Sequence, residues 1–135
     1  MANYTGITRT NLFRVNDEAA FRKLTKRIAC EDDLIVMEKI HDTQKYFGLA
    51  CYSTLQLLDE GGEDIIDDID ELYFALQQVL HQEDMIILFE IGHEALRYVA
   101  GSYVIITSHQ IYYGGLKEAA EAKALEFMPQ AKIIY

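Results

Sequence analysis

The stretch LIVMEKIHDTQKYFGLACY, residues 34–52, decides the fold. Residues 34–40 are a short apolar run of strand length that contains β-branched residues, and residues 45–52 form a second such run. The four residues between them, His41 to Gln44, are polar and typical of a turn. Because two strands joined by a short turn pair antiparallel, this hairpin predicts a mainly antiparallel sheet.

Further strands are expected on both sides of this hairpin. The continuous apolar run DMIILFEI predicts a central strand covered on both of its faces. Two more runs around a polar turn predict a second hairpin, and the last five residues, AKIIY, are compatible with an edge strand. The expected strands beyond the first hairpin are residues 5–15, 84–91, 97–107, 111–113 and 131–135.

Three helices are predicted from helical spacing of apolar residues. The first covers residues 17–30, with Asn16 as the N-cap and an apolar stripe of Phe21, Leu24 and Ile28. The second follows two glycines, covers residues 63–81, and has the apolar stripe Ile65, Ile69, Leu72, Leu76, Val79 and Leu80. The third covers residues 116–128 and is ended by Pro129.

These elements predict one α+β domain over residues 1–135, with a mainly antiparallel sheet packed against about three helices. The expected order is β-α-β-β-α-β-β-β-α, followed by the terminal edge strand. A chain of 135 residues has the usual size of one domain and can bury a hydrophobic core without disulfides. We therefore expect Cys30 and Cys51 to be small buried residues.

The chain has no secretory signal pattern and no apolar run long enough to span a bilayer. A cytoplasmic protein without a membrane partner is therefore expected. Its formal net charge is −10, which disfavours direct binding to nucleic acid, because such binding needs clustered lysine and arginine.

The negative charge is concentrated just after the middle of the chain. Eight acids and no base lie in residues 59–71, which leaves 14 acids and 12 bases elsewhere. If this segment is helical, its charges recur with a spacing comparable to that of nucleic-acid phosphates. We call this set the acidic segment and expect it to bind a basic protein surface: Asp59, Glu60, Glu63, Asp64, Asp67, Asp68, Asp70 and Glu71.

A second candidate site is the polar stretch EIGHEALR at the end of the expected central strand. There, Glu90, His93, Glu94 and Arg97 could form a small catalytic or ligand-binding group, with His93 as a general base. A polar turn with a local Glu94–Arg97 ion pair explains the same residues without any chemistry. The spacing of histidines fits no metal site, and no cofactor motif is present, so neither a metal nor a cofactor is expected.

Three stretches carry a resemblance: TRTNLFRVNDEAAF (8–21), FEIGHEALRYVAGSYVIIT (89–107) and the acidic segment between them. With these the chain resembles a family of small uncharacterised acidic bacterial proteins encoded on mobile elements and phages. The resemblance implies no activity or catalytic residue. It does imply a context in which small acidic proteins sometimes inhibit host enzymes by imitating DNA.

The leading hypothesis is a non-enzymatic interaction module whose acidic segment engages a basic, nucleic-acid-binding surface of a partner protein. The first alternative is a small enzyme or ligand-binding domain with its site at residues 90–97. The second alternative is a homodimer joined through an exposed strand edge, with residues 131–135 as the candidate edge.

Overall fold

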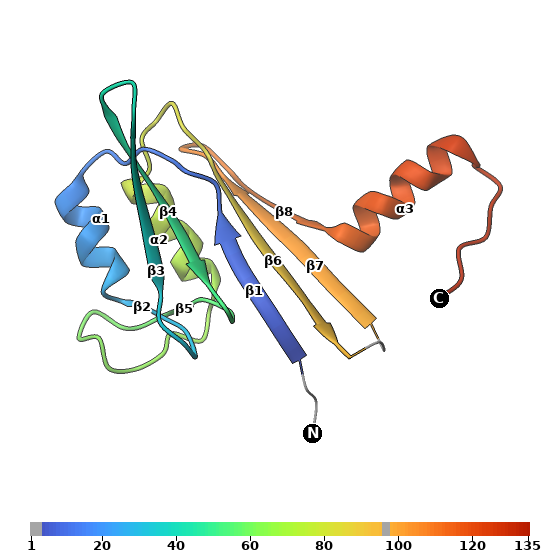
Figure 1. Cartoon of the computed structure of the whole chain (residues 1–135), viewed down its shortest axis with the longest axis horizontal. Helices are drawn as coiled ribbons and strands as arrows, with labels where there is room; N and C mark the ends of the chain where they lie inside the picture. The colour runs from blue at the N-terminus through green and yellow to red at the C-terminus, as the bar shows by residue number, and fades with distance from the viewer. Residues whose placement is uncertain (1–3, 96–97) are drawn as a thin grey trace.

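The N-terminal strand lies in the middle of a six-stranded antiparallel sheet, and two helices cover one face of that sheet. The computed structural model describes residues 4–95 and 98–135 (Figure 1). The elements in chain order are β1 (Tyr4–Thr10), α1 (Glu18–Thr25), β2 (Ile28–Ala29), β3 (Ile35–His41), β4 (Gln44–Cys51), β5 (Gln56–Leu57), α2 (Asp70–Val79), β6 (Ile86–Glu94), β7 (Tyr98–Ile106), β8 (Ile111–Gly115) and α3 (Leu116–Phe127). This confirms the predicted α+β class.

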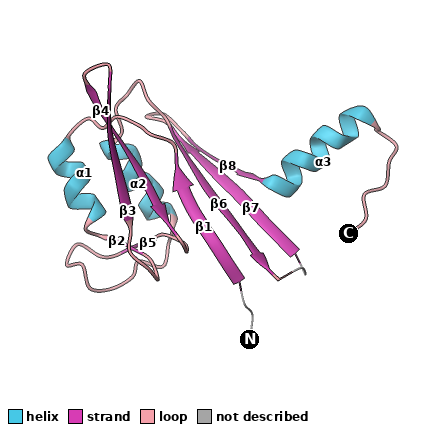
Figure 2. Cartoon of the chain, viewed as in Figure 1, coloured by secondary structure: helices cyan, strands magenta, loops and turns pink. Residues whose placement is uncertain are grey.

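The sheet is built from two antiparallel units that flank β1. Its strand order is β3-β4-β1-β6-β7-β8, and β2 and β5 form a separate two-stranded ladder (Figure 2). The hairpin at residues 34–52 is confirmed, with His41 paired to Gln44. The two residues between them, Asp42 and Thr43, have φ values of 50° and 65°, as a tight hairpin turn of the I′ type requires.

The hydrophobic core lies between this sheet and helices α1 and α2. Its aromatic centre is Phe21 of α1, whose ring lies 5.9 Å from Phe13 and 4.7 Å from Phe47 of β4. All three rings are fully buried. Aliphatic side chains extend this core across both helices and three strands: Leu24, Leu49, Leu72, Leu76, Ile86 and Ile106.

Only one face of the sheet is covered, and the strand β6 shows this most directly. Ile86 and Leu88 point into the core, whereas Phe89 and Ile91 are 44% and 52% exposed on the opposite face. The prediction of a central strand covered on both faces is therefore wrong. We call this uncovered side the open face; it belongs to a sheet that is wider than its two packed helices (Figure 1).

Several boundaries differ from those predicted. Asp17, not Asn16, caps α1, because the Asn16 side-chain amide donates instead to the carbonyl oxygen of Gln78 at 2.9 Å. The first strand ends at Thr10, and residues 131–135 form no strand. The predicted terminal edge strand is therefore wrong.

The second helix starts seven residues later than predicted, at Asp70 rather than at residue 63. Its predicted stripe is buried from Leu72 onward, whereas Ile65 and Ile69 are exposed. No helix in the described part of the chain is long and apolar enough to cross a membrane.

The aromatic centre predicts unequal costs for two substitutions on neighbouring helices. Phe21→Ala should lower the free energy of unfolding by about 3–5 kcal/mol, because it removes a fully buried ring. Phe74→Ala removes a ring from the half-exposed side of α2 and should cost less than about 1 kcal/mol. Urea unfolding followed by circular dichroism measures both, and equal losses would contradict this description of the core.

Candidate functional site

The acidic segment is an irregular loop followed by the first turn of α2. Only Asp70 and Glu71 of its eight acids are helical, so the regular helical array of charges predicted from the sequence is not formed. The loop is nevertheless anchored at both ends. Leu58 pairs with Ile65 in an isolated β-bridge, and the amide of Ile66 donates to the carbonyl oxygen of Leu57 at 2.7 Å.

A tight turn at residues 59–64 directs the acidic side chains outward. The amide of Gly62 donates to the carbonyl oxygen of Asp59, and Gly62 has a φ of 75° that favours glycine. The carboxylate of Asp59 accepts the amide of Glu63 at 3.0 Å, and this hydrogen bond lowers the pKa of Asp59. Arg27 donates to the carbonyl oxygens of Leu58 and Asp59, so its guanidinium holds the loop backbone rather than a carboxylate.

In the part of the chain that the structure describes, no lysine, arginine or histidine forms an ion pair with the acidic segment. The bases that do form ion pairs are engaged elsewhere. Arg14 donates to Asp84 at 2.7 Å, and Lys45 contacts Glu18 and Glu38 at 3.2 Å and 3.0 Å. The carboxylates of the segment are therefore not neutralised by ion pairs, although the Arg27 guanidinium lies against the loop backbone at Asp59.

Two of the eight acids have structural contacts at the start of α2. Asp68 accepts the amide of Asp70 at 3.0 Å, and Asp70 accepts the hydroxyl of Tyr113 at 2.5 Å. The contact with Asp70 raises the pKa of Tyr113 to about 12. Five acids of the segment are exposed and have no such side-chain contact: Glu60, Glu63, Asp64, Asp67 and Glu71.

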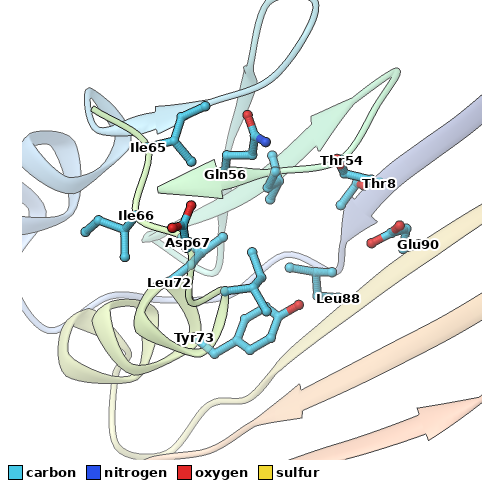
Figure 3. Close-up of a pocket in the computed structure, with 12 residues that line it drawn as sticks. Thr8, Thr54, Gln56, Ile65, Ile66, Asp67, Leu72, Tyr73, Leu88 and Glu90 are labelled. Carbon is cyan, nitrogen blue, oxygen red and sulfur yellow. The ribbon is translucent and has the colours of Figure 1, made fainter. Parts of the chain in front are cut away.

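A pocket of about 300 Å³ lies between the acidic segment and the covered face of the sheet. Asp67 lies on its loop side, while Glu90 of β6 and Thr8 of β1 lie on its sheet side (Figure 3). Tyr73 directs its hydroxyl toward the same space (Figure 3). The apolar part of the lining comes from Leu55, Ile65, Ile66, Ile69, Leu72 and Leu88.

Glu90 is the most unusual titratable group of this pocket. It lies opposite Thr8 and Ser102 in the sheet register, on the face that carries Leu88 and the core. Burial raises its pKa, because the ionised carboxylate loses water there. In the described part of the chain, no lysine or arginine lies within ion-pair distance of Glu90. The pocket therefore contains a half-buried carboxylate without a cation.

Of the other members of the second candidate site, neither His93 nor Glu94 lies beside Glu90. Strand alternation places His93 on the open face, where it is exposed, and Glu90 on the covered face. Glu94 lies on the same side of β6 as Glu90, but four residues, or two repeats of the strand, further along it. Arg97 is outside the described residues. Glu90 and His93 thus cannot act on one bound molecule.

Among the described residues, one group has the donor atoms of a metal site. The Sγ atoms of Cys30 and Cys51 and a carboxylate oxygen of Asp32 lie within 4.8 Å of one another. Both thiols, however, donate to backbone carbonyl oxygens at 3.1 Å, and burial raises the pKa of Cys30 to about 11. A metal binds thiolates, whereas the Cys30 thiol is protonated at neutral pH. Cys51 is buried, as predicted, and Cys30 is half-buried.

Comparison of the chain with family models, with curated proteins and with solved structures gives no match. What the pocket and the acidic segment do must therefore be inferred from their own geometry.

Replacing Glu90 tests whether its ionised carboxylate destabilises the folded protein. Because burial raises the pKa of Glu90 above its unfolded value, the ionised form destabilises the fold at pH values above that pKa. Glu90→Gln should therefore increase the free energy of unfolding at pH 8. The gain should disappear near pH 4, where the wild-type carboxyl is itself protonated.

The matched control is Glu31→Gln, which removes one negative charge from an exposed loop. Urea unfolding of both variants at pH 8 and pH 4 separates local desolvation from a general effect of net charge. Equal gains for the two variants at pH 8 would show that Glu90 is not destabilised by its position.

Proposed function

We propose that this protein is a non-enzymatic interaction module that binds a basic surface of a partner protein through the acidic segment. The observation that supports this most strongly is that, within the described residues, none of the eight acids forms an ion pair with a base of the same chain. A surface of this kind attracts a positively charged partner over a distance of about 8 Å at physiological ionic strength.

The pocket beneath the acidic segment gives this surface a specific anchor. A lysine or arginine side chain can place its aliphatic stem against Ile69 and Leu72 and its charged end between Asp67 and Glu90. Its cation would offset the cost of burying the Glu90 carboxylate and lower the pKa of that group. In many protein interfaces, a side chain buried in a pocket contributes most of the binding energy, and exposed charged residues surround it.

The expected partner surface is one that binds nucleic acid, because such surfaces carry clustered lysine and arginine. The irregular path of residues 59–69 favours recognition by charge and pocket rather than by imitation of regularly spaced phosphates. An enzymatic role has less support, since His93 and Glu90 lie on opposite faces of the sheet.

Neutralising exposed loop acids should weaken binding to a basic probe. The test variant carries Glu60→Gln, Glu63→Gln and Asp64→Asn, which leave the hydrogen bonds of the Asp59, Asp68 and Asp70 side chains intact. The control carries Glu31→Gln, Asp33→Asn and Asp42→Asn, at exposed positions outside the acidic segment, and has the same net charge. The probe is a short fluorescent peptide of lysine and arginine, titrated by fluorescence anisotropy.

We expect the test variant to bind this peptide roughly tenfold more weakly at low salt, because three exposed charges contribute about 0.2–1 kcal/mol each. The control should bind like the wild type, and raising the salt to about 0.3 M should reduce the difference. If both variants weaken equally, binding reflects net charge alone and the acidic segment is not a specific interface.

A further inference from the structure

The C-terminal helix α3 extends away from the rest of the molecule beyond the edge strand β8 (Figure 1). None of its 12 residues is buried. The helix and the segment after it nevertheless carry many large apolar side chains that are exposed: Leu116, Leu125, Phe127, Met128, Ile133, Ile134 and Tyr135. A helix that packs on nothing is normally unstable in water, because most helical stability comes from tertiary packing.

A groove of about 690 Å³ lies where α3 leaves the sheet. Ala119 and Ala122 form its helix side, and the stacked rings of Tyr103 and Tyr112, 6.3 Å apart, form its sheet side. At the base of the groove, the Leu116 side chain approaches Gly101 so closely that an added Cβ would lie 2.9 Å from it. The small residues leave room for side chains from another segment.

This groove continues onto the open face. In the sheet register, Tyr103 lies directly opposite Phe89 and Gly101 lies opposite Ile91. Phe89 and Ile91 are exposed, and Ile7 and Val99 on the adjoining strands are exposed as well. The groove and these four residues lie on one side of the sheet, together with the exposed side chains of Arg9 and His93, and no element in the described part of the chain covers them.

The exposed area of the chain supports a second copy as the occupant. A compact monomer of 15.5 kDa exposes about 7,200 Å², whereas this chain exposes 9300 Å². An interface that buried this excess of about 2,100 Å² on each of two chains would total about 4,200 Å², which is within the range of obligate homodimers.

The distribution of charge is compatible with such self-association. Residues 116–135 contain three lysines and three glutamates and are therefore neutral, although the whole chain has a charge of −10. The acidic segment borders the covered face, and α3 contacts the open face through Leu116 and Gly101. Two copies can therefore join through α3 while their acidic segments remain on the outer sides.

We infer that the protein forms a two-fold symmetric dimer in which residues 116–135 of each chain cover the groove and open face of the other. The contact is reciprocal, as a two-fold interface requires, and buries the apolar side chains of α3 together with Phe89 and Ile91. This inference does not depend on the proposed function of the acidic segment.

Sedimentation velocity combined with light scattering tests the dimer. The wild type should have twice the chain mass of 15.5 kDa at micromolar concentration. Ile91→Lys on the open face and Phe127→Lys at the end of α3 should each weaken association at least 100-fold. Phe74→Lys, an equally exposed apolar position on α2, should leave the dimer intact.

Mixing the two disrupted variants tests whether the contact is reciprocal. In a mixed dimer, the intact α3 of the Ile91→Lys chain meets the intact open face of the Phe127→Lys chain, so one of the two contacts is restored. We expect the mixture to associate more strongly than either variant alone. A monomeric wild type, or variants that dimerise like the wild type with unchanged circular dichroism, would overturn the inference.

Discussion

The structure depends on a one-sided hydrophobic core: α1 and α2 pack on a single face of a six-stranded sheet and do not reach its far side. The rings of Phe13, Phe21 and Phe47 join α1 to the segment that follows β1 and to the strand β4. Both helices are short, with 8 and 10 residues, whereas β6 and β7 have 9 residues each and extend beyond them. This difference in length between helices and strands gives rise both to the pocket on the covered face and to the uncovered apolar residues on the open face.

On the covered face, this difference in length produces the pocket. Where α2 begins, the loop at residues 65–69 closes over the sheet instead of a helix, and the space between them is not filled by side chains. Glu90 occupies the position at which an aliphatic residue would complete the core that Leu88 begins. A sequence selected only for stability would not place a carboxylate there, and destabilised positions of this kind are common at binding sites.

On the open face, this difference in length leaves Phe89 of β6 exposed, and α3, which touches its own sheet at Gly101, has no buried residue. Exposed apolar residues favour aggregation of a monomer, whereas in a dimer the same residues form the interface. Binding of a basic partner and self-association would thus use opposite faces of one sheet, so neither needs to interfere with the other.

Much of this fold could be predicted from the sequence, because hairpins and amphipathic helices leave local patterns. The turn at Asp42 and Thr43 and the buried positions Phe21 and Leu24 are examples. The start of α2 could not be read from its apolar spacing. Ile65 fits a helical stripe, but like charges four residues apart disfavour a helix through residues 60–69, and Leu58 pairs with Ile65 instead.

The pocket itself had no sequence signal. Asp67 and Glu90 belong to a loop and a strand that are distant in the chain, and only the folded sheet brings them to one cavity. The residue periodicity that identified β6 as a buried strand also could not reveal that its second face stays open. A continuous apolar run has the same sequence pattern whether its second face is covered by an element of the same chain or by a second copy.

The most direct test of the central claim is a map of amide chemical-shift changes in ¹⁵N-labelled protein titrated with a lysine-rich peptide. Changes are expected only in residues 59–73 and in Thr8, Leu88 and Glu90, which together comprise the acidic segment and residues that line its pocket. Changes spread over all exposed acids, or centred on the open face, would show that the acidic segment and its pocket are not the site where a basic partner binds.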